Sequence, residues 1–331
     1  MIEVPCGDCS GCRLDHAADW AGRCAMECKN WKNNFFVTFT YDNDHLPHTS
    51  DGRRTLKKKD FSNFMKRLRK ATDGAEEWTN PITEKREKII RFFACGEYGS
   101  KRGRPHYHAA LFNLAIPDLK FYKENMHGDK LYTSEWLSKI WGQGFVIIGF
   151  LNYESASYIA RYCQKKSYYK KSDEFWDKKW YKRWVWVDEH GRTTNEKNGV
   201  KQVKRLIRKD EKEEEFINMS RAVGLGRMHW EKVKESIIKN TCGRISIKTK
   251  KGIKHIKISR YFKKCWEKED WESLEKYKYK EKLQAEENKK KILAETDYGE
   301  DSEEKNWATY LKTQEEIHNS RIRFLKRENM I

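Results

Sequence analysis

The sequence predicts an α+β fold: a central, mainly antiparallel sheet with flanking helices, followed by a charged helical C-terminal region. Three observations lead to this prediction. Runs of β-branched and aromatic residues alternate with segments of helical periodicity. Two of these runs follow one another across a Gly/Pro turn, which predicts an antiparallel hairpin within the alternation. The last part of the chain is dense in Glu and Lys with scattered Leu and Ile, as in exposed helices.

The first elements follow from local patterns. Residues 35–41 are β-branched or aromatic throughout and predict a strand. An amphipathic helix follows, because apolar residues recur at helical spacing with cations on the other face. Residues 89–95 and 106–112 predict the two strands of the hairpin. The apolar positions of the helix are Phe61, Phe64, Met65 and Leu68.

Three further elements complete the order β-α-β-β-α-β-α. They are a helix around 134–141, a strand at 144–150 and a helix from about 154 to 166, each bounded by Gly, Asn or Ser. We therefore expect helices on one face of the sheet. Later signals are weaker: a turn at 219–226, a hairpin at 245–259, and terminal helices broken near 298–299.

Charge indicates a polyanionic partner. The chain has 331 residues, 37% of them hydrophobic, which suffices for a core, and a formal charge of +19. The excess lies before Trp266, because the residues from there onward hold 14 Lys/Arg against 17 Asp/Glu. A folded basic region rich in Trp, Tyr and Phe favours single-stranded nucleic acid, whose bases stack on aromatic rings. The alternative is a basic protein with no such ligand.

Two common classes of location are not favoured. No apolar run reaches the ~18 residues that a membrane span needs, and the N-terminus lacks the layout of a signal peptide. We therefore expect no membrane partner and a cytosolic protein. Nine cysteines in a reducing compartment are expected to be thiols or metal ligands rather than disulfides.

His106 and His108 are the candidate metal ligands. They flank Tyr107 on a predicted strand, so both imidazoles point to the same face. Glu97 lies at the end of the partner strand, where hairpin pairing brings it opposite the histidines. Two imidazoles with a carboxylate suit Mg²⁺ or Mn²⁺. The alternative is a chance His-x-His on an exposed strand.

Tyr158 and Tyr162 are the candidate nucleophiles. On a helix they share a stripe with Lys165 and Lys166, while Ile159 falls on an adjacent stripe that can pack on the sheet. Lysines favour a phenolate and a phosphate's charge, so this grouping suits attack of a tyrosine on phosphorus. The alternative is an amphipathic helix whose tyrosines cover the edge of the core.

Two further groups are predicted to bind ligands. The cationic turn between the hairpin strands and a helical arginine are candidate DNA contacts, although a cationic turn is also typical of a solvated loop. Five cysteines near the N-terminus are candidate zinc ligands, with the alternative that the last two are small core residues. The DNA candidates are Lys101, Arg102, Arg104 and Arg161, and the zinc candidates are Cys6, Cys9, Cys12, Cys24 and Cys28.

Three motifs in this order resemble those of the HUH endonucleases, and more narrowly the replication initiators of gokushovirus-type microviruses, which are small single-stranded DNA phages. The motifs are Glu97-Tyr98-Gly99, His106-Tyr107-His108 and Tyr158-x-x-x-Tyr162-x-x-Lys165-Lys166, preceded by residues 36–41. Residues 5–13, 64–69 and 219–226 are also similar to that group, and the resemblance covers roughly 4–230. Tyr107 takes the bulky hydrophobic place between the histidines.

The resemblance implies initiation of rolling-circle replication in the cytoplasm of a bacterial host. One tyrosine would cleave an origin strand and keep its 5′-phosphate, the free 3′-hydroxyl would prime synthesis, and the second tyrosine would permit religation. It also implies a division of the chain into a Cys-rich segment (1–34) packed on the nuclease, an HUH-like endonuclease domain (35–180), an accessory basic region (181–265) and a charged helical tail (266–331).

Three other functions remain open on the residues alone. A noncatalytic single-strand binder would stack bases without using the tyrosines as nucleophiles. A metal-dependent nuclease using water would need the histidines but not the tyrosines. A plasmid relaxase resembles a pattern with its tyrosine near the N-terminus, whereas here the tyrosines follow the histidines. The tail is a candidate surface for a host replication helicase, on composition alone.

Overall fold

The structure is a computed structural model that describes residues 10–49, 52–71, 77–79, 86–99, 102–162, 180–190, 193–194, 199–208, 212–221, 223–239, 244–250, 252–296 and 302–324. Its helices are α1 (Ser10–Cys28), α2 (Lys58–Ala71), α3 (Glu135–Trp141), α4 (Tyr153–Tyr162), α6 (Arg227–Lys239), α7 (Arg260–Glu269), α8 (Trp271–Glu295) and α9 (Glu303–Phe324). Its strands are β1 (Asn34–Thr40), β2 (Glu77–Thr79), β3 (Arg86–Lys88), β4 (Arg91–Tyr98), β5 (Pro105–Phe112), β6 (Lys120–Glu124), β7 (Lys130–Thr133), β8 (Val146–Phe150), β9 (Trp180–Val187), β10 (Thr193–Thr194), β11 (Lys201–Arg208), β12 (Phe216–Met219), β13 (Arg244–Thr249) and β14 (Gly252–Lys257).

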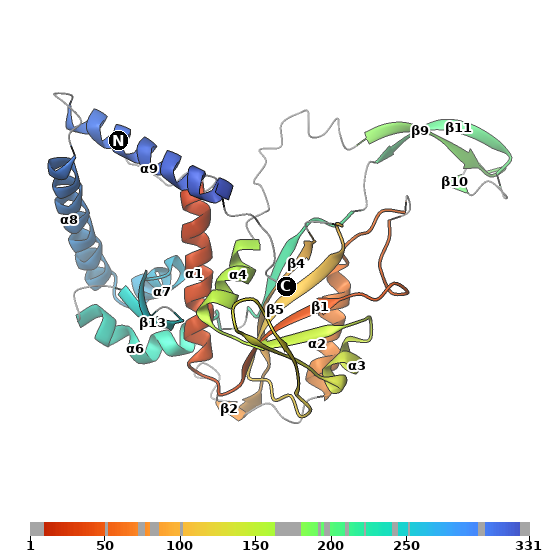
Figure 1. The fold of residues 1–331 in the computed structure, drawn as a ribbon, viewed down its shortest axis with the longest axis horizontal. Coiled ribbons are helices and arrows are strands. Elements are labelled where there is room, and N and C mark those ends of the chain that lie inside the picture. The colour runs from red at the N-terminus through yellow and green to blue at the C-terminus, as the bar shows by residue number, and fades with distance from the viewer. Residues whose placement is uncertain are drawn as a thin grey trace.

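A seven-stranded sheet in the order β12-β4-β5-β1-β8-β7-β6 forms the centre of the fold (Figure 1). Every neighbouring pair in it is antiparallel, so the predicted α+β class with an antiparallel sheet is confirmed. The predicted hairpin is β4–β5, and its register places Glu97 opposite His106. The HUH strand β5 therefore lies in the interior of the sheet, between β4 and β1.

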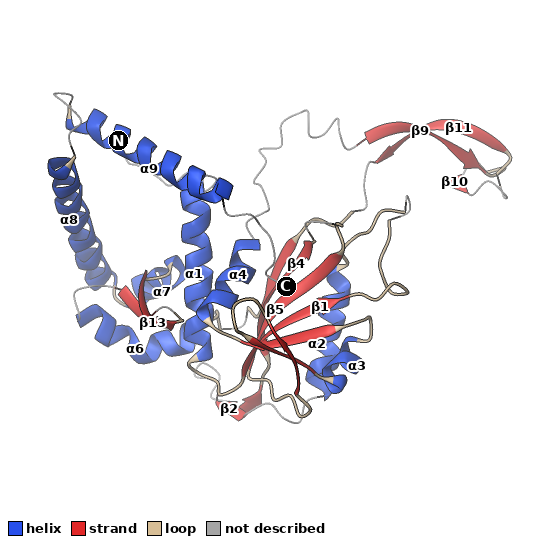
Figure 2. Ribbon diagram, in the orientation of Figure 1, coloured by secondary structure: helices blue, strands red, loops and turns tan. Residues whose placement is uncertain are grey.

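Helices cover both faces of this sheet, so the expectation of a single covered face is wrong (Figure 2). α2 and α3 cover one face, where Phe61, Phe64 and Trp141 pack around Phe39 of β1. α1 and α4 cover the other face, where Ile159 is fully buried. The physical reason is that the central strands are buried on both sides: all eight residues of β5 are buried.

The region expected to be accessory, 181–265, supplies part of the central fold. β12 pairs with β4 as an edge strand of the main sheet. Leu225, Trp230 and Phe262, which follow it in the chain, are fully buried in the same core cluster as residues of α1. The predicted hairpin at 245–259 is β13–β14 and is confirmed. β9, β10 and β11 form a separate three-stranded sheet, which Figure 1 shows apart from the centre.

A buried ion pair fixes α1 to the sheet. Glu27 of α1 and Arg91 of β4 are both fully buried, and their charged groups lie 2.7 Å apart. The Glu27 carboxylate also accepts hydrogen bonds from the Trp31 indole at 2.8 Å and the Gly226 backbone N–H at 2.7 Å. The carboxylate therefore joins three segments that are far apart in the sequence.

The predicted helical tail is confirmed as α8 and α9, and the break expected near 298–299 lies outside the described residues. α8 begins in the core, since Leu274 is 1% exposed, whereas most of its later residues are exposed. In the described part of the chain, no helix has both the length and the apolarity needed to span a membrane.

Candidate active site

Glu97, His106 and His108 form a compact group that can hold a metal ion. Strand alternation and hairpin pairing place the three side chains on the face of the sheet that α1 and α4 cover. Nε2 of His106 lies 2.7 Å and Nε2 of His108 lies 3.2 Å from the same Glu97 oxygen. All three residues are buried, and their potential ligand atoms lie within 4.8 Å of one another.

The other nitrogen of each imidazole is also bonded. Nδ1 of His106 lies 3.0 Å from the Arg104 carbonyl, which can only accept, so this nitrogen donates. Nδ1 of His108 lies 2.9 Å from the Thr38 hydroxyl. Nε2 of each ring is thereby turned toward the carboxylate. Second contacts of this kind orient the histidines of metal sites.

The donor set fits a cation. Both ring nitrogens of His106 face acceptors, so the ring either carries two protons or shares Nε2 with a positive ion. Burial would by itself raise the pKa of Glu97, but the hydrogen bonds from His106 and His108 outweigh it and lower that pKa to about 2. The carboxylate is therefore ionised at neutral pH, as a metal ligand must be.

Tyr158 lies directly beside the group. Asn152 and Ser155 cap the start of α4, because each side-chain oxygen accepts from the other residue's backbone N–H at 2.7 and 2.9 Å. Ile159 anchors the helix in the core. The Tyr158 ring meets the His108 ring edge to face, with centroids 5.2 Å apart, and also contacts Phe36 at 6.0 Å. The candidate nucleophile is thus in contact with a candidate metal ligand.

The other predicted members of the nucleophile stripe are only partly described. Tyr162 closes α4 one turn after Tyr158, and Arg161 precedes it, but the side chains of both lie outside the described residues. Lys165 and Lys166 lie wholly outside them, as does Lys101 in the hairpin turn.

The rest of the cationic turn has structural contacts. The Arg104 guanidinium donates to the Tyr41 carbonyl at 2.8 Å and to the Asn43 side chain at 3.0 Å. Arg102 is exposed, and its carbonyl accepts from Arg54 at 3.1 Å. Arg104 therefore holds two loops together, which its sequence position did not indicate, and its contact with DNA stays a prediction.

The cysteines divide between two ends of α1. Cys12 and Cys24 are twelve residues apart in one helix, a rise of about 18 Å, so they do not share one ion. Cys24 is fully buried in the core, and burial raises the pKa of Cys28 to about 12. Both facts favour the interpretation of Cys24 and Cys28 as core residues. Cys6 and Cys9 lie outside the described residues, so a zinc site there stays a prediction.

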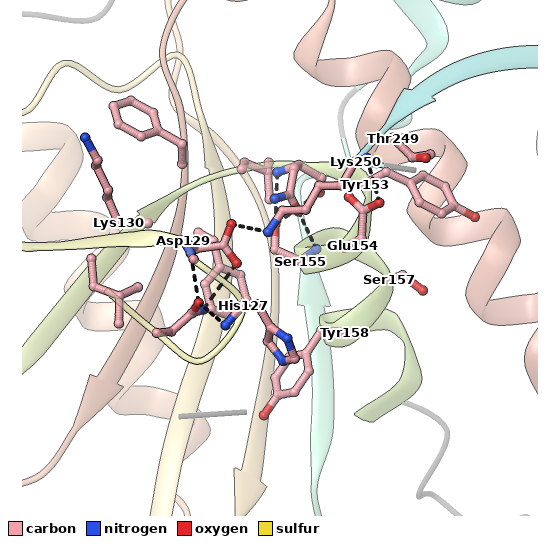
Figure 3. A pocket seen from close by; sticks show the side chains of 18 of the residues that line it. His127, Asp129, Lys130, Tyr153, Glu154, Ser155, Ser157, Tyr158, Thr249 and Lys250 are labelled. Carbon is pink, nitrogen blue, oxygen red and sulfur yellow. Dashed lines mark hydrogen bonds and ion pairs between the residues drawn. The ribbon is translucent and has the colours of Figure 1, made fainter. Parts of the chain in front are cut away.

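A pocket of about 1410 Å³ opens beside Tyr158 and His108 (Figure 3). α4 and the sheet form its inner walls. Its outer walls are the β6–β7 hairpin and the turn of β13–β14, two segments that are more than a hundred residues apart in the sequence. The lining combines lysines with aromatic rings, including Lys123, Lys130, Lys250, Lys254, Phe36, Tyr132, Phe150 and Tyr153.

Sequence reasoning missed several of these residues. Thr38 could have been found, because it shares the parity of the strand face that carries the site. The lysines of the two outer walls had no such signal. β6 is exposed along its whole length and shows no alternation, and nothing local connects Lys250 with α4.

Comparison with known proteins agrees with this site. Residues 34–167, which include all of the metal group and the capped start of α4, match the family model of the replication-associated protein ORF2. The chain is 36% identical over 268 residues to Replication-associated protein ORF2 of Spiroplasma virus 4, covering 80% of this chain and 68% of that protein.

Two shorter matches point the same way. The chain is 36% identical over 162 residues to Replication-associated protein VP4 of Bdellovibrio phage phiMH2K, covering 49% of this chain and 48% of that protein. It is 32% identical over 167 residues to Replication-associated protein ORF4 of Chlamydia phage 1, covering 49% of this chain and 38% of that protein. No solved structure matches the chain. The family predicted from the motifs is thereby confirmed: the chain belongs to the ORF2 family of phage replication-associated proteins.

Proposed function

We propose that this protein initiates rolling-circle replication by nicking single-stranded origin DNA with a tyrosine, and that Tyr158 makes the first attack. The observation that carries the proposal is the contact between the Tyr158 ring and His108, a member of the buried metal group, at the inner wall of a basic and aromatic pocket. A pocket of this composition suits a single strand with unpaired bases.

The metal group has a definite part in this proposal. Glu97, His106 and His108 would hold Mg²⁺ or Mn²⁺, which when bound would polarise the phosphoryl oxygens. Thr38 and the Arg104 carbonyl orient the two imidazoles. Their roles do not depend on the identity of the ion.

The proposed reaction exchanges one phosphoester for another. The Tyr158 oxygen loses its proton and forms a bond to phosphorus, and the bond from phosphorus to the 3′-oxygen breaks. The 3′-oxygen takes a proton, leaving a free 3′-hydroxyl and a 5′-phosphotyrosine, with no water consumed. The link conserves the phosphodiester energy for religation, which would use Tyr162. Lys165 and Lys166 would stabilise the phenolate and the phosphate charge.

The proposed setting follows from the relatives, which are phage proteins. We propose that the chain acts on phage origin DNA in the cytoplasm of a bacterial host. A host replication helicase is the proposed partner of the charged α8–α9 surface. Further candidate contacts with the strand are Lys101, Arg102 and Arg161.

A covalent adduct is the test. Purified full-length protein is incubated with circular single-stranded phage DNA and Mn²⁺, and a denaturing gel is examined for DNA-linked protein. We expect an adduct with the wild type, none with Tyr158→Phe in a single turnover, and none with the Tyr158→Phe/Tyr162→Phe double variant. Tyr153→Phe, on the same helix, is the matched control and should keep the adduct.

Each other result has a definite meaning. Cleavage without an adduct would replace the proposal with a water-using nuclease. Binding without cleavage would replace it with a noncatalytic single-strand binder. An adduct retained by Tyr158→Phe and lost in Tyr162→Phe would assign the first attack to Tyr162.

A further inference from the structure

The turn of the β13–β14 hairpin is joined to both other elements that border the pocket. The Lys250 backbone N–H donates to the Glu154 carboxylate of α4 at 3.1 Å. The Lys250 ammonium forms an ion pair with Asp129, in the loop between β6 and β7. Figure 3 shows Lys250 between these two carboxylates, on the same pocket as Tyr158. Lys250 therefore connects the nucleophile helix to the opposite hairpin.

The hairpin is held firmly in this position. Ile245, Ile247 and Ile256 are buried in the core cluster that also contains Ile159 of α4. Lys254 lies over the Tyr153 ring of α4, with its nitrogen 4.9 Å from the ring centroid. The turn is thus built against the nucleophile helix, although it lies beyond the residues 34–167 that match the family.

The charges of the pocket favour a polyanion once DNA competes for Lys250. Four lysines and two carboxylates line it, and both carboxylates are those that Lys250 contacts. The Lys250–Asp129 pair is partly exposed, with side chains 41% and 35% accessible. Pairs of this kind contribute little net free energy, so a phosphate can displace the Asp129 carboxylate.

We propose that the β13–β14 turn is a phosphate-binding wall of the DNA site, and that Lys250 exchanges Asp129 for a backbone phosphate of the bound strand. The Lys250–Asp129 pair is then a clasp across the pocket that opens as the strand enters. This inference rests on the proposed function for the identity of the ligand as single-stranded DNA, and it adds a contact outside the nuclease motifs.

The test measures affinity for a fluorescent oligothymidylate by anisotropy, with full-length protein in EDTA and at several salt concentrations. Lys250→Ala should weaken binding about tenfold and lower the salt slope by about one, because a phosphate contact is lost. Asp129→Asn should strengthen binding about two- to fivefold, because the competing carboxylate is gone. The double variant should bind as weakly as Lys250→Ala.

The double variant separates two roles for Lys250. If Lys250 only neutralises Asp129, the double variant recovers wild-type affinity, and the exchange is overturned. Unchanged affinity in Lys250→Ala, or weaker binding in Asp129→Asn, also overturns it. Lys276→Ala removes a 77% accessible lysine from α8 and is the matched control, which should bind as the wild type does.

Failure of this inference is distinguishable from failure of the proposed function. A wild-type protein that forms the tyrosine adduct, with Lys250→Ala unchanged in affinity, loses the clasp and keeps the nicking activity. Binding that depends on Lys250, with no adduct under any condition, keeps the phosphate-binding wall and removes the nicking activity.

Discussion

At the scale of single residues, the site depends on how the two imidazoles are held. The Thr38 hydroxyl lies 2.9 Å from Nδ1 of His108, and this contact directs Nε2 of the ring toward Glu97. A histidine that has lost such a partner can rotate or change tautomer. Thr38 is therefore a positioning residue, which acts through His108.

Thr38→Val should weaken metal binding. The substitution keeps the side chain's shape and removes the bond to His108, so we expect the Kd for Mn²⁺ to rise about tenfold. The measurement is free Mn²⁺ in a titration followed by electron paramagnetic resonance. Thr38→Ser should restore the affinity. Thr40→Val is the control, because the Thr40 hydroxyl bonds to the Phe145 carbonyl instead; an equal loss there would contradict a specific role for Thr38.

Glu97 should make stability depend on acid pH. Burial raises its pKa, but hydrogen bonds from the two histidines lower it further, from the ordinary 4.5 to about 2. Because the pKa is lower in the folded protein, the stabilisation is complete above pH 4.5 and is lost as the pH falls toward 2. Its size is on the order of 3 kcal/mol.

The measurement compares metal-free wild type with Glu97→Gln by urea unfolding across this pH range. We expect the wild type to lose more free energy of unfolding than the variant, which has no carboxylate to protonate. Parallel curves for the two proteins would show that Glu97 does not carry the dependence.

At the scale of elements, α1 shows how a helix with weak local signals is placed. Small residues, Ala17, Ala21 and Cys24, are buried along one side of it and allow close packing. Its position is then set by the Glu27 carboxylate, which contacts Arg91 and the Gly226 backbone. α1 in turn packs beside the nucleophile helix α4 in the same core cluster.

Glu27→Ala should therefore destabilise the fold strongly. It leaves the Arg91 guanidinium buried without its carboxylate, and breaking a buried ion pair in this way costs about 3–5 kcal/mol. The free energy of unfolding is measured in urea. Glu267→Ala, which removes one partner of a surface pair with Lys278, is the control and should change stability by less than about 1 kcal/mol. Similar effects of the two variants would exclude a special role for Glu27.

At the scale of the whole molecule, the charged tail is not separable at its predicted boundary. Trp266 is 3% exposed and Leu274 is 1% exposed, and both belong to the core cluster that supports α1 and α4. α9, in contrast, contributes no residue to the buried core of the described chain. The core therefore extends into α8 and ends there.

Two truncations test this boundary. Ending the chain at Asp301 removes α9 and should shift the Tm by no more than about 2–4 °C. Ending it at Cys265 removes Trp266 and α8 and should cost more than about 3 kcal/mol, because a buried Trp is lost. Thermal unfolding followed by circular dichroism measures both. A large shift on removal of α9 alone would show that the tail supports the core. Removal of α9 alone also permits the proposed helicase contact to be tested without unfolding the nuclease.

The sequence by itself determined the elements whose signals are local. The strand period places His106 and His108 on one face, the hairpin brings Glu97 opposite them, and helical spacing buries Ile159. These features depend on neighbours a few residues away, so period and turn chemistry suffice to predict them. The family was predictable for the same reason, because its motifs lie on these elements.

The tertiary structure alone decided which faces are covered and what borders the pocket. β5 is buried on both sides because α1, whose signals are weak, packs opposite α2. Lys250 and Asp129 are 121 residues apart and meet only because two hairpins pack around α4. Such contacts arise from side-chain packing between distant segments, and no local period encodes that packing.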